Sequence, residues 1–215
     1  MESLEAVTET KTTELIDKAF SLGMIQDPKE ITAFVDFLKP RALRNVMEIG
    51  SESGGTFYLW CQLAKLGGLK ISLDKPDGTS GSWLYKEPDA LAKRTALFHS
   101  FAPRVKVVTG DSHSPEIKSI VMDILGEEKL DLLFIDGDHS YEGVKADWEM
   151  YREFVRPGGI VAFHDINQGE WMNIRGCQVG RLWAELMAFS SLYPELRPQE
   201  FNSKLHWAGI GVVQI

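Results

Sequence analysis

Residues 45–68 read NVMEIGSESGGTFYLWCQLAKLGG and hold the pattern that decides the fold. Residues 45–49 form a short apolar run that Gly50 ends, which predicts a buried strand. Over residues 53–66 the apolar positions recur at helical spacing, until Gly67 and Gly68 end the helix. The segment therefore predicts a strand, a glycine turn and a helix in succession.

The same unit repeats along the chain. Further strands are predicted at residues 69–73, 105–109, 130–135 and 159–163, and further helices at residues 88–101, 115–125, 141–155 and 179–189. Because right-handed crossovers join such alternating elements, we expect a doubly wound α/β fold whose mainly parallel sheet carries helices on both faces. A last strand at residues 208–215 is expected to pair antiparallel with a segment around residues 198–204.

Two more helices are predicted before the first strand, at residues 13–26 and from Pro28 to before Pro40. They predict an N-terminal helical cap over residues 1–40, on a main unit of residues 41–215. A chain of 215 residues exceeds the usual ~100–150 of one domain but suits a single decorated α/β domain. The cap also offers a surface for a homo-oligomer contact.

Composition narrows the range of partners. The chain has 31 acidic and 23 basic residues, a net charge of −8, and a pI of about 5.2, which argues against nucleic acid as the main partner. No apolar run approaches the ~20 residues that span a bilayer, and we expect no secretory signal. Cys61 and Cys177 fall in segments predicted as helical, which favours buried free thiols. We expect a cytoplasmic protein without a membrane partner.

The glycine turn, Glu48 to Gly54, is open to two interpretations: a plain strand-to-helix turn, or a turn that holds a ligand against the helix N-terminus. A dinucleotide fingerprint would need glycine where Glu52 stands, and no P-loop sequence follows. Asp74 ends the second strand, where an acid can accept hydrogen bonds from both ribose hydroxyls, and Asp111 follows the third.

Together these residues resemble the class I S-adenosylmethionine-dependent methyltransferases, whose Rossmann-like fold places the cofactor at this edge of the sheet. The resemblance implies that residues 41–215 are an S-adenosylmethionine-binding catalytic domain. It assigns Asp74 to the ribose and Asp111 to the adenine. The residues that it assigns to the methionine part are Glu48, Gly50, Ser51, Ser53 and Gly54.

A second group of polar residues follows the fourth and fifth strands, in the segment LLFIDGDHSYEGVKADWEMYREFVRPGGIVAFHDIN at residues 132–167. The two strands should be neighbours, so their carboxyl-terminal residues are expected to converge. Those residues are Asp136, Asp138 and His139 after one strand, and His164, Asp165 and Asn167 after the other. Carboxylates brought together raise one another's pKa or bind a cation. Oxygen ligands favour Mg²⁺ or Ca²⁺, and an imidazole ligand favours Mn²⁺, Fe²⁺ or Zn²⁺.

The segment resembles the group that includes macrocin O-methyltransferase and the cephalosporin hydroxylase-like proteins. The resemblance assigns Asp136 and Asp165 to a divalent metal, with Mg²⁺ the expected ion, and His139 to the general base. His164 matches a ligand position in some members, although the macrolide enzymes have an acid there. The resemblance thus implies a metal-dependent O-methyltransferase acting on a hydroxyl of a small molecule, of sugar or phenol type.

Other interpretations stay open at this point. The same cluster would serve a metal-assisted hydrolase or hydroxylase, and the fold alone would also suit a non-catalytic binding protein. His139 could contact only backbone at a helix start, and Asp138 is expected to be a solvent-facing or capping acid rather than a ligand. His99, His113 and His206 have no acidic companion at metal-ligand spacing in sequence.

Two segments are candidates for contact with the acceptor. Residues 75–88 predict a loop, and its Trp83, Leu84 and Tyr85 favour a lid. Trp171 and Met172 either shape the acceptor pocket or belong to a surface loop within residues 167–176.

Overall fold

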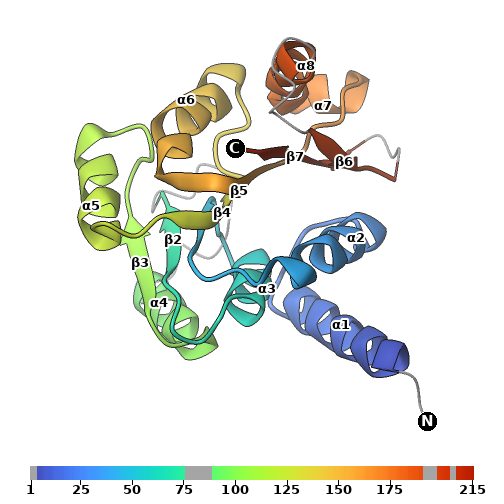
Figure 1. The fold of residues 1–215 in the computed structure, drawn as a ribbon. Coiled ribbons are helices and arrows are strands. Elements are labelled where there is room, and N and C mark those ends of the chain that lie inside the picture. The colour runs from blue at the N-terminus through green and yellow to red at the C-terminus, as the bar shows by residue number, and fades with distance from the viewer. Residues whose placement is uncertain (1–3, 76–88, 191–197, 204–206) are drawn as a thin grey trace.

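Seven strands form one mixed sheet in the order β3-β2-β1-β4-β5-β7-β6 (Figure 1). This is a computed structural model, and it describes residues 4–75, 89–190, 198–203 and 207–215. The strands are β1 (Val46–Ile49), β2 (Lys70–Asp74), β3 (Val105–Thr109), β4 (Leu130–Ile135), β5 (Val155–His164), β6 (Gln199–Phe201) and β7 (Ile210–Gln214). β1 to β5 run parallel, and β7 pairs antiparallel with both β5 and β6, which confirms the predicted fold class.

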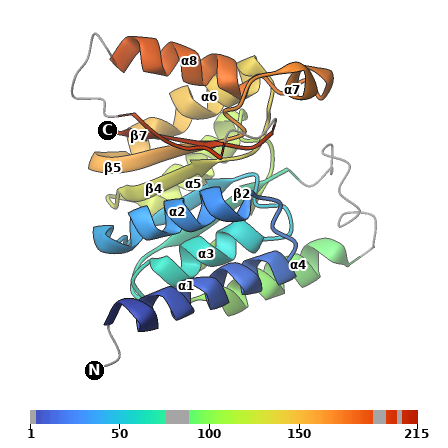
Figure 2. The ribbon, with the colours of Figure 1, turned by 90° about the vertical axis from the view of Figure 1, so that its right-hand side faces the viewer.

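Helices cover both faces of the sheet (Figures 1 and 2). One face packs against α1 (Leu4–Ser21), α2 (Pro28–Leu38), α3 (Gly55–Leu63) and α4 (Ala90–Phe101). The other face packs against α5 (Pro115–Leu125), α6 (Tyr141–Tyr151) and α8 (Val179–Ser190), and α7 (Glu170–Ile174) lies beside the end of β5. Short 3₁₀ turns follow α2 and α6, at Lys39–Arg41 and Arg152–Phe154. β1 and β4 are buried along their whole length, as expected for parallel strands covered on both sides.

Four details of the sequence prediction are wrong. The first helix spans Leu4–Ser21 rather than residues 13–26. The fifth strand begins at Val155 rather than Gly159. Its pairing with β4 shifts register around Pro157 and Gly158, so the backbone is extended there and does not continue α6. Cys177 lies between α7 and α8 and not in a helix, although both cysteines are buried and free as predicted. Residues 167–176 include the helix α7 and are not simply a loop.

The division into a cap and a main domain stays a prediction. Residues of α1 and α2 share one hydrophobic core with α3, α4 and the sheet. The proposed lid residues Trp83, Leu84 and Tyr85 lie outside the described residues. No helix in the described ranges is both long and apolar enough to cross a bilayer.

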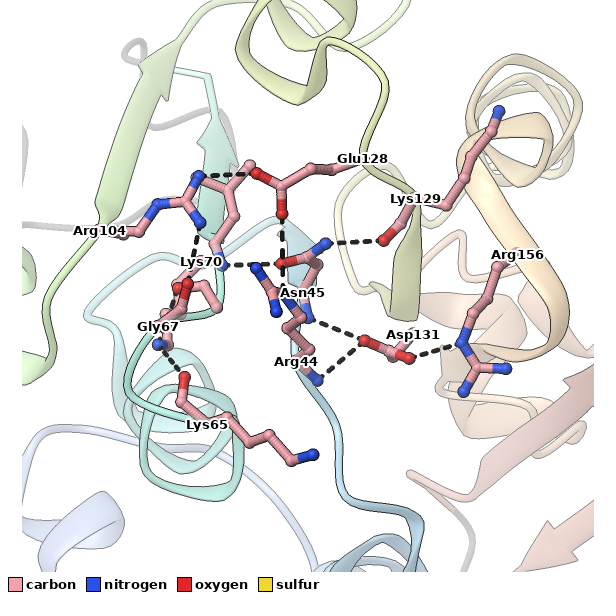
Figure 3. Close-up of polar contacts among 12 residues, drawn as sticks. Arg44, Asn45, Lys65, Gly67, Lys70, Arg104, Glu128, Lys129, Asp131 and Arg156 are labelled. Carbon is pink, nitrogen blue, oxygen red and sulfur yellow. Dashed lines mark hydrogen bonds and ion pairs between the residues drawn. The ribbon is translucent and has the colours of Figure 1, made fainter.

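The amino ends of β1, β2 and β4 are joined by a polar network (Figure 3). The Asp131 carboxylate accepts hydrogen bonds from the backbone N–H groups of Arg44 and Asn45, at 2.8 and 2.9 Å, and from the Arg156 guanidinium at 2.6 Å. The Asn45 side chain accepts from Leu69 N–H and donates to the Lys129 carbonyl. These side chains hold the amino ends of the strands in register. The candidate site lies at the opposite, carboxyl ends of the strands.

Replacing Asp131 with alanine is expected to destabilise the fold by about 2–4 kcal/mol, because two backbone N–H groups and Arg156 lose their acceptor. Urea unfolding checks this. Glu128→Ala is the matched control: it removes ion pairs with Arg104 and Arg44 in the same network, and its cost should stay below about 1 kcal/mol. Equal losses in the two variants would contradict the role given to Asp131.

Candidate active site

A cleft of about 800 Å³ opens at the carboxyl edge of the parallel strands. The strand order reverses between β1 and β4, and such switch points are where α/β proteins bind ligands. Seven of the predicted site residues line the cleft: Gly50, Asp74, Asp111, Asp136, His139, His164 and Asp165. The chain thus brings the glycine turn and the acid and histidine cluster to one place.

The glycine turn after β1 is packed tightly against the residue that follows β4. Gly50 has φ +87°, and a Cβ there would lie 2.0 Å from the backbone oxygen of Asp136. Gly54 has φ +91°, and a Cβ there would lie 2.1 Å from the Phe98 ring. Both positions therefore require glycine for packing as well as for conformation.

Three other predicted residues lie in or under this turn. Ser51 and Ser53 line a smaller cavity of about 50 Å³ beside the main cleft. Glu48 is fully buried beneath the turn, where its Oε1 accepts a hydrogen bond from Trp60 Nε1 at 3.3 Å. Burial is the main reason that the pKa of Glu48 is raised to about 8. Neither Glu48 nor Gly54 is among the described residues that line the two cavities.

The acids after β2 and β3 are held by neighbouring donors. Asp74 accepts from the backbone N–H of Glu52 at 2.7 Å and from Arg94 at 2.9 Å, so it ties α4 to the glycine turn. Asp111 accepts from the backbone N–H of His113 at 3.0 Å and pairs with Lys75 at 3.2 Å. The His113 N–H bond is the largest cause that lowers the pKa of Asp111. The lowered pKa keeps Asp111 ionised in the wall of the cleft at neutral pH.

The residues after β4 and β5 converge as predicted by the strand order. Asp136 Oδ1 lies 3.1 Å from His139 Nε2 and 3.2 Å from His164 Nδ1. Asp165 Oδ1 lies 3.5 Å from His164 Nδ1, and its Oδ2 lies 3.9 Å from His139 Nδ1. Potential ligand atoms of Asp136, His164 and Asp165 all lie within 4.8 Å of one another.

Electrostatics couple these groups strongly. Burial opposes the ionisation of Asp136, but His164 and His139 hold the pKa of that carboxyl well below its usual range. Burial also disfavours a charged imidazole, yet the Asp136 carboxylate raises the pKa of His164 to about 9. The pKa of His139 is raised in the same way. Since only neutral imidazole binds a metal, an ion that used His164 would displace its proton.

The donor set fits a divalent cation, because two carboxylates and an imidazole converge with short separations. Asp165 also has φ +61°, a left-handed conformation that side chains seldom adopt and that is often found at functional sites. Cys177, His139 and Asp165 form a second group of potential ligand atoms within 4.8 Å of one another.

The remaining candidates take smaller roles. Asp138 Oδ1 accepts from the backbone N–H of Ser140 at 2.8 Å, but the residue that caps α6 is Ser140, whose hydroxyl accepts from the Gly143 N–H. Asn167 donates to the Trp207 carbonyl. Trp171 and Met172 line the cleft from α7, which is the first of the two positions considered for them, and Trp207 lines it as well.

Sequence reasoning missed a polar pair in the cleft wall. His113 Nε2 lies 3.3 Å from Asp147 Oδ1, and Asp147 is fully buried on α6, so His113 has an acidic companion after all. The available signal was the position of Asp147 on the buried stripe of α6, between Val144 and Trp148, where a charged side chain is unusual. Gln26, which lies near Asp136, was also missed.

The order of strands, the glycine turn and the strand-end acids together define the Rossmann-like methyltransferase fold. Residues 47–166 match a family model described as a methyltransferase domain, and the chain belongs to this family. An uncharacterised protein of Acanthamoeba polyphaga mimivirus is 31% identical over 142 residues, which are 66% of this chain. The chain spans 60% of the length of that relative and 16% of a second curated relative.

Solved structures show the same fold. The O-methyltransferase TomG from Streptomyces achromogenes, solved with S-adenosylmethionine, has a TM-score of 0.64 and 15% identity, over 94% of this chain and 89% of that one. The methyltransferase MycE of the mycinamycin pathway, solved with Mg and S-adenosylhomocysteine, has a TM-score of 0.60 and 18% identity, over 94% of this chain and 54% of that one.

The raised pKa of Glu48 gives a testable pH dependence of stability. The folded protein keeps a proton on Glu48 up to about pH 8, whereas the unfolded chain releases it near the ordinary value of 4.5. The folded state therefore binds more protons between these values, and stability falls as the pH rises through that window. In Glu48→Gln the side chain is neutral at every pH, so the variant should lack this part of the fall in stability.

Unfolding free energies at about pH 5.5 and about pH 8.5 test this linkage. The variant should gain stability relative to the wild type at the higher pH. Parallel pH profiles for the two proteins would mean that Glu48 does not titrate in this window.

Proposed function

We propose that the protein is a metal-dependent O-methyltransferase that moves a methyl group from S-adenosylmethionine to a hydroxyl of a small molecule. One observation carries the proposal: a single cleft is lined by the glycine turn, the acids Asp74 and Asp111, and the cluster of Asp136, His139 and Asp165. Neither the glycine turn with its acids nor the acid and histidine cluster would indicate a group transfer alone, but together they would supply a nucleoside site beside a site for a hydroxyl.

The charge of the cleft favours this cofactor over a dinucleotide. Glu52 lines it in the glycine turn and would repel a pyrophosphate, whereas S-adenosylmethionine carries no phosphate. Carboxylates at strand ends can accept hydrogen bonds from ribose hydroxyls, which suits Asp74. TomG, with the same fold, was solved with this cofactor, which supports the assignment.

Asp136 and Asp165, with His164, are the residues that would hold the metal. A divalent ion bound there would lower the pKa of an acceptor hydroxyl, as it does for water. The MycE structure contains Mg, which supports a metal in a protein of this fold. Mg²⁺ suits the carboxylates, and Mn²⁺ would tolerate the imidazole better.

His139 would act as the general base. In the neutral form of His139, Nε2 would carry the proton that faces the Asp136 carboxylate, which only accepts, and Nδ1 would be left with its lone pair. Nδ1 would take the acceptor's proton as the acceptor oxygen bonds to the methyl carbon, and the electron pair of the broken carbon–sulfur bond stays on sulfur. Trp171, Met172 and Trp207 line the same cleft and would pack against the acceptor, holding its oxygen in line.

Calorimetric titration of the EDTA-treated protein with S-adenosylhomocysteine tests the cofactor assignment. We expect saturable binding of one molecule per chain, because the product contacts the same groups as the cofactor. The matched variant Asp74→Asn should bind more weakly, since it removes the ribose acceptor's charge. Lack of binding by the wild type would contradict the proposal and favour the hydrolase or binding-protein interpretation.

His139→Ala separates chemistry from binding. With methyl-labelled S-adenosylmethionine and a panel of phenolic and sugar acceptors, turnover should fall by about 100-fold or more, the usual contribution of a general base. Binding of S-adenosylhomocysteine should change little. His99→Ala is the control, since His99 lies exposed on α4. Unchanged turnover in His139→Ala would rule out the base.

A further inference from the structure

The connection between α1 and α2 brings a buried amide to the site. Gln26 is only 4% exposed, and its Nε2 lies 3.5 Å from Oδ2 of Asp136, a residue 110 positions later in the chain. The carboxylate accepts hydrogen bonds and cannot donate when ionised, so the amide must turn its N–H toward Asp136. The amide oxygen, Oε1, consequently points away from the carboxylate.

That oxygen is buried and has no hydrogen-bond partner among the described residues. An unsatisfied buried acceptor is destabilising by about 1–3 kcal/mol, so we expect a donor at this oxygen that the described residues do not supply. Gln26 lines the cavity of about 50 Å³ that also includes Ser51, Ser53 and Asp136. This space is large enough for one small polar group.

The surrounding backbone holds Gln26 firmly in this position. Asp27, the next residue, caps α2 by accepting from the N–H groups of Lys29 and Glu30, both at 3.0 Å. On the other side, a Cβ at Gly55 would lie 2.6 Å from the backbone nitrogen of Met24, so the connection packs directly on the start of α3. The amide is therefore part of a fixed wall of the cavity.

We propose that Gln26 is a ligand-binding residue whose Oε1 accepts a hydrogen bond from the ammonium group at the amino-acid end of the cofactor. The group must be a donor, since Oε1 can only accept, and a positive charge is favoured because the Asp136 carboxylate borders the same cavity. A carboxylate in this space would face Asp136 and be repelled.

This inference rests on the proposed function, since it takes the cofactor to be S-adenosylmethionine. It adds a specific role for the N-terminal segment: the residues before the first strand complete the cofactor site. The same amide steadies Asp136 through Nε2, so a single side chain contacts both the cofactor and a predicted metal-binding acid.

Calorimetry on the metal-free protein tests the contact. The two probes are S-adenosylhomocysteine and its analogue in which hydrogen replaces the α-amino group. Gln26→Met keeps the length of the side chain and removes both polar atoms. It should weaken S-adenosylhomocysteine binding by about 10- to 100-fold, as expected for a hydrogen bond to a charged group, and change binding of the analogue by less than about twofold.

Two further variants make the result decisive. Gln26→Asn keeps the amide but withdraws it by one methylene, and it should show the same selective loss if Gln26→Met does not fold. Asp74→Asn should weaken both probes equally, because the ribose is common to them. Equal losses for both probes in the Gln26 variants would overturn the inference and leave the proposed function standing. Failure of the wild type to bind S-adenosylhomocysteine would overturn both.

Discussion

The convergence of Asp136 and Asp165 at the ends of two adjacent parallel strands is the constraint on which the site depends. Two carboxylates so close repel one another unless positive charge or hydrogen-bond donors offset them. The protein supplies these from separate segments: His139 after β4, His164 at the end of β5 and Gln26 before α2. These groups offset the negative charge of the two carboxylates, and the proposed cation would offset it further.

Much of the fold was predictable because the strands and helices follow their hydrophobic patterns closely. β3, α5 and β4 begin and end where the sequence predicts, since each has a clear apolar period and a distinct boundary residue. The errors fall where local signals conflict. Pro157 and Gly158 argue against a strand, yet pairing with β4 carries β5 through them. Only tertiary contacts decide such cases.

The site was predictable only in part, and for a physical reason. Strand-end residues such as Asp136 and Asp165 could be brought together by topology alone, because parallel strands end at one edge. The contact of Gln26 with Asp136 joins residues 110 positions apart, through a helix connection whose path no local pattern determines. His113 and Asp147 meet for a similar reason, through the packing of α6 against the loop after β3.

A crystal structure of the protein soaked with Mn²⁺ and S-adenosylhomocysteine tests the central claim most directly. We expect one anomalous peak within coordination distance of Asp136 and Asp165, about 2.1–2.3 Å from their oxygens, with the nucleoside between Asp74 and Asp111 in the same cleft. A metal bound elsewhere, or a cleft that takes up neither probe, would contradict it.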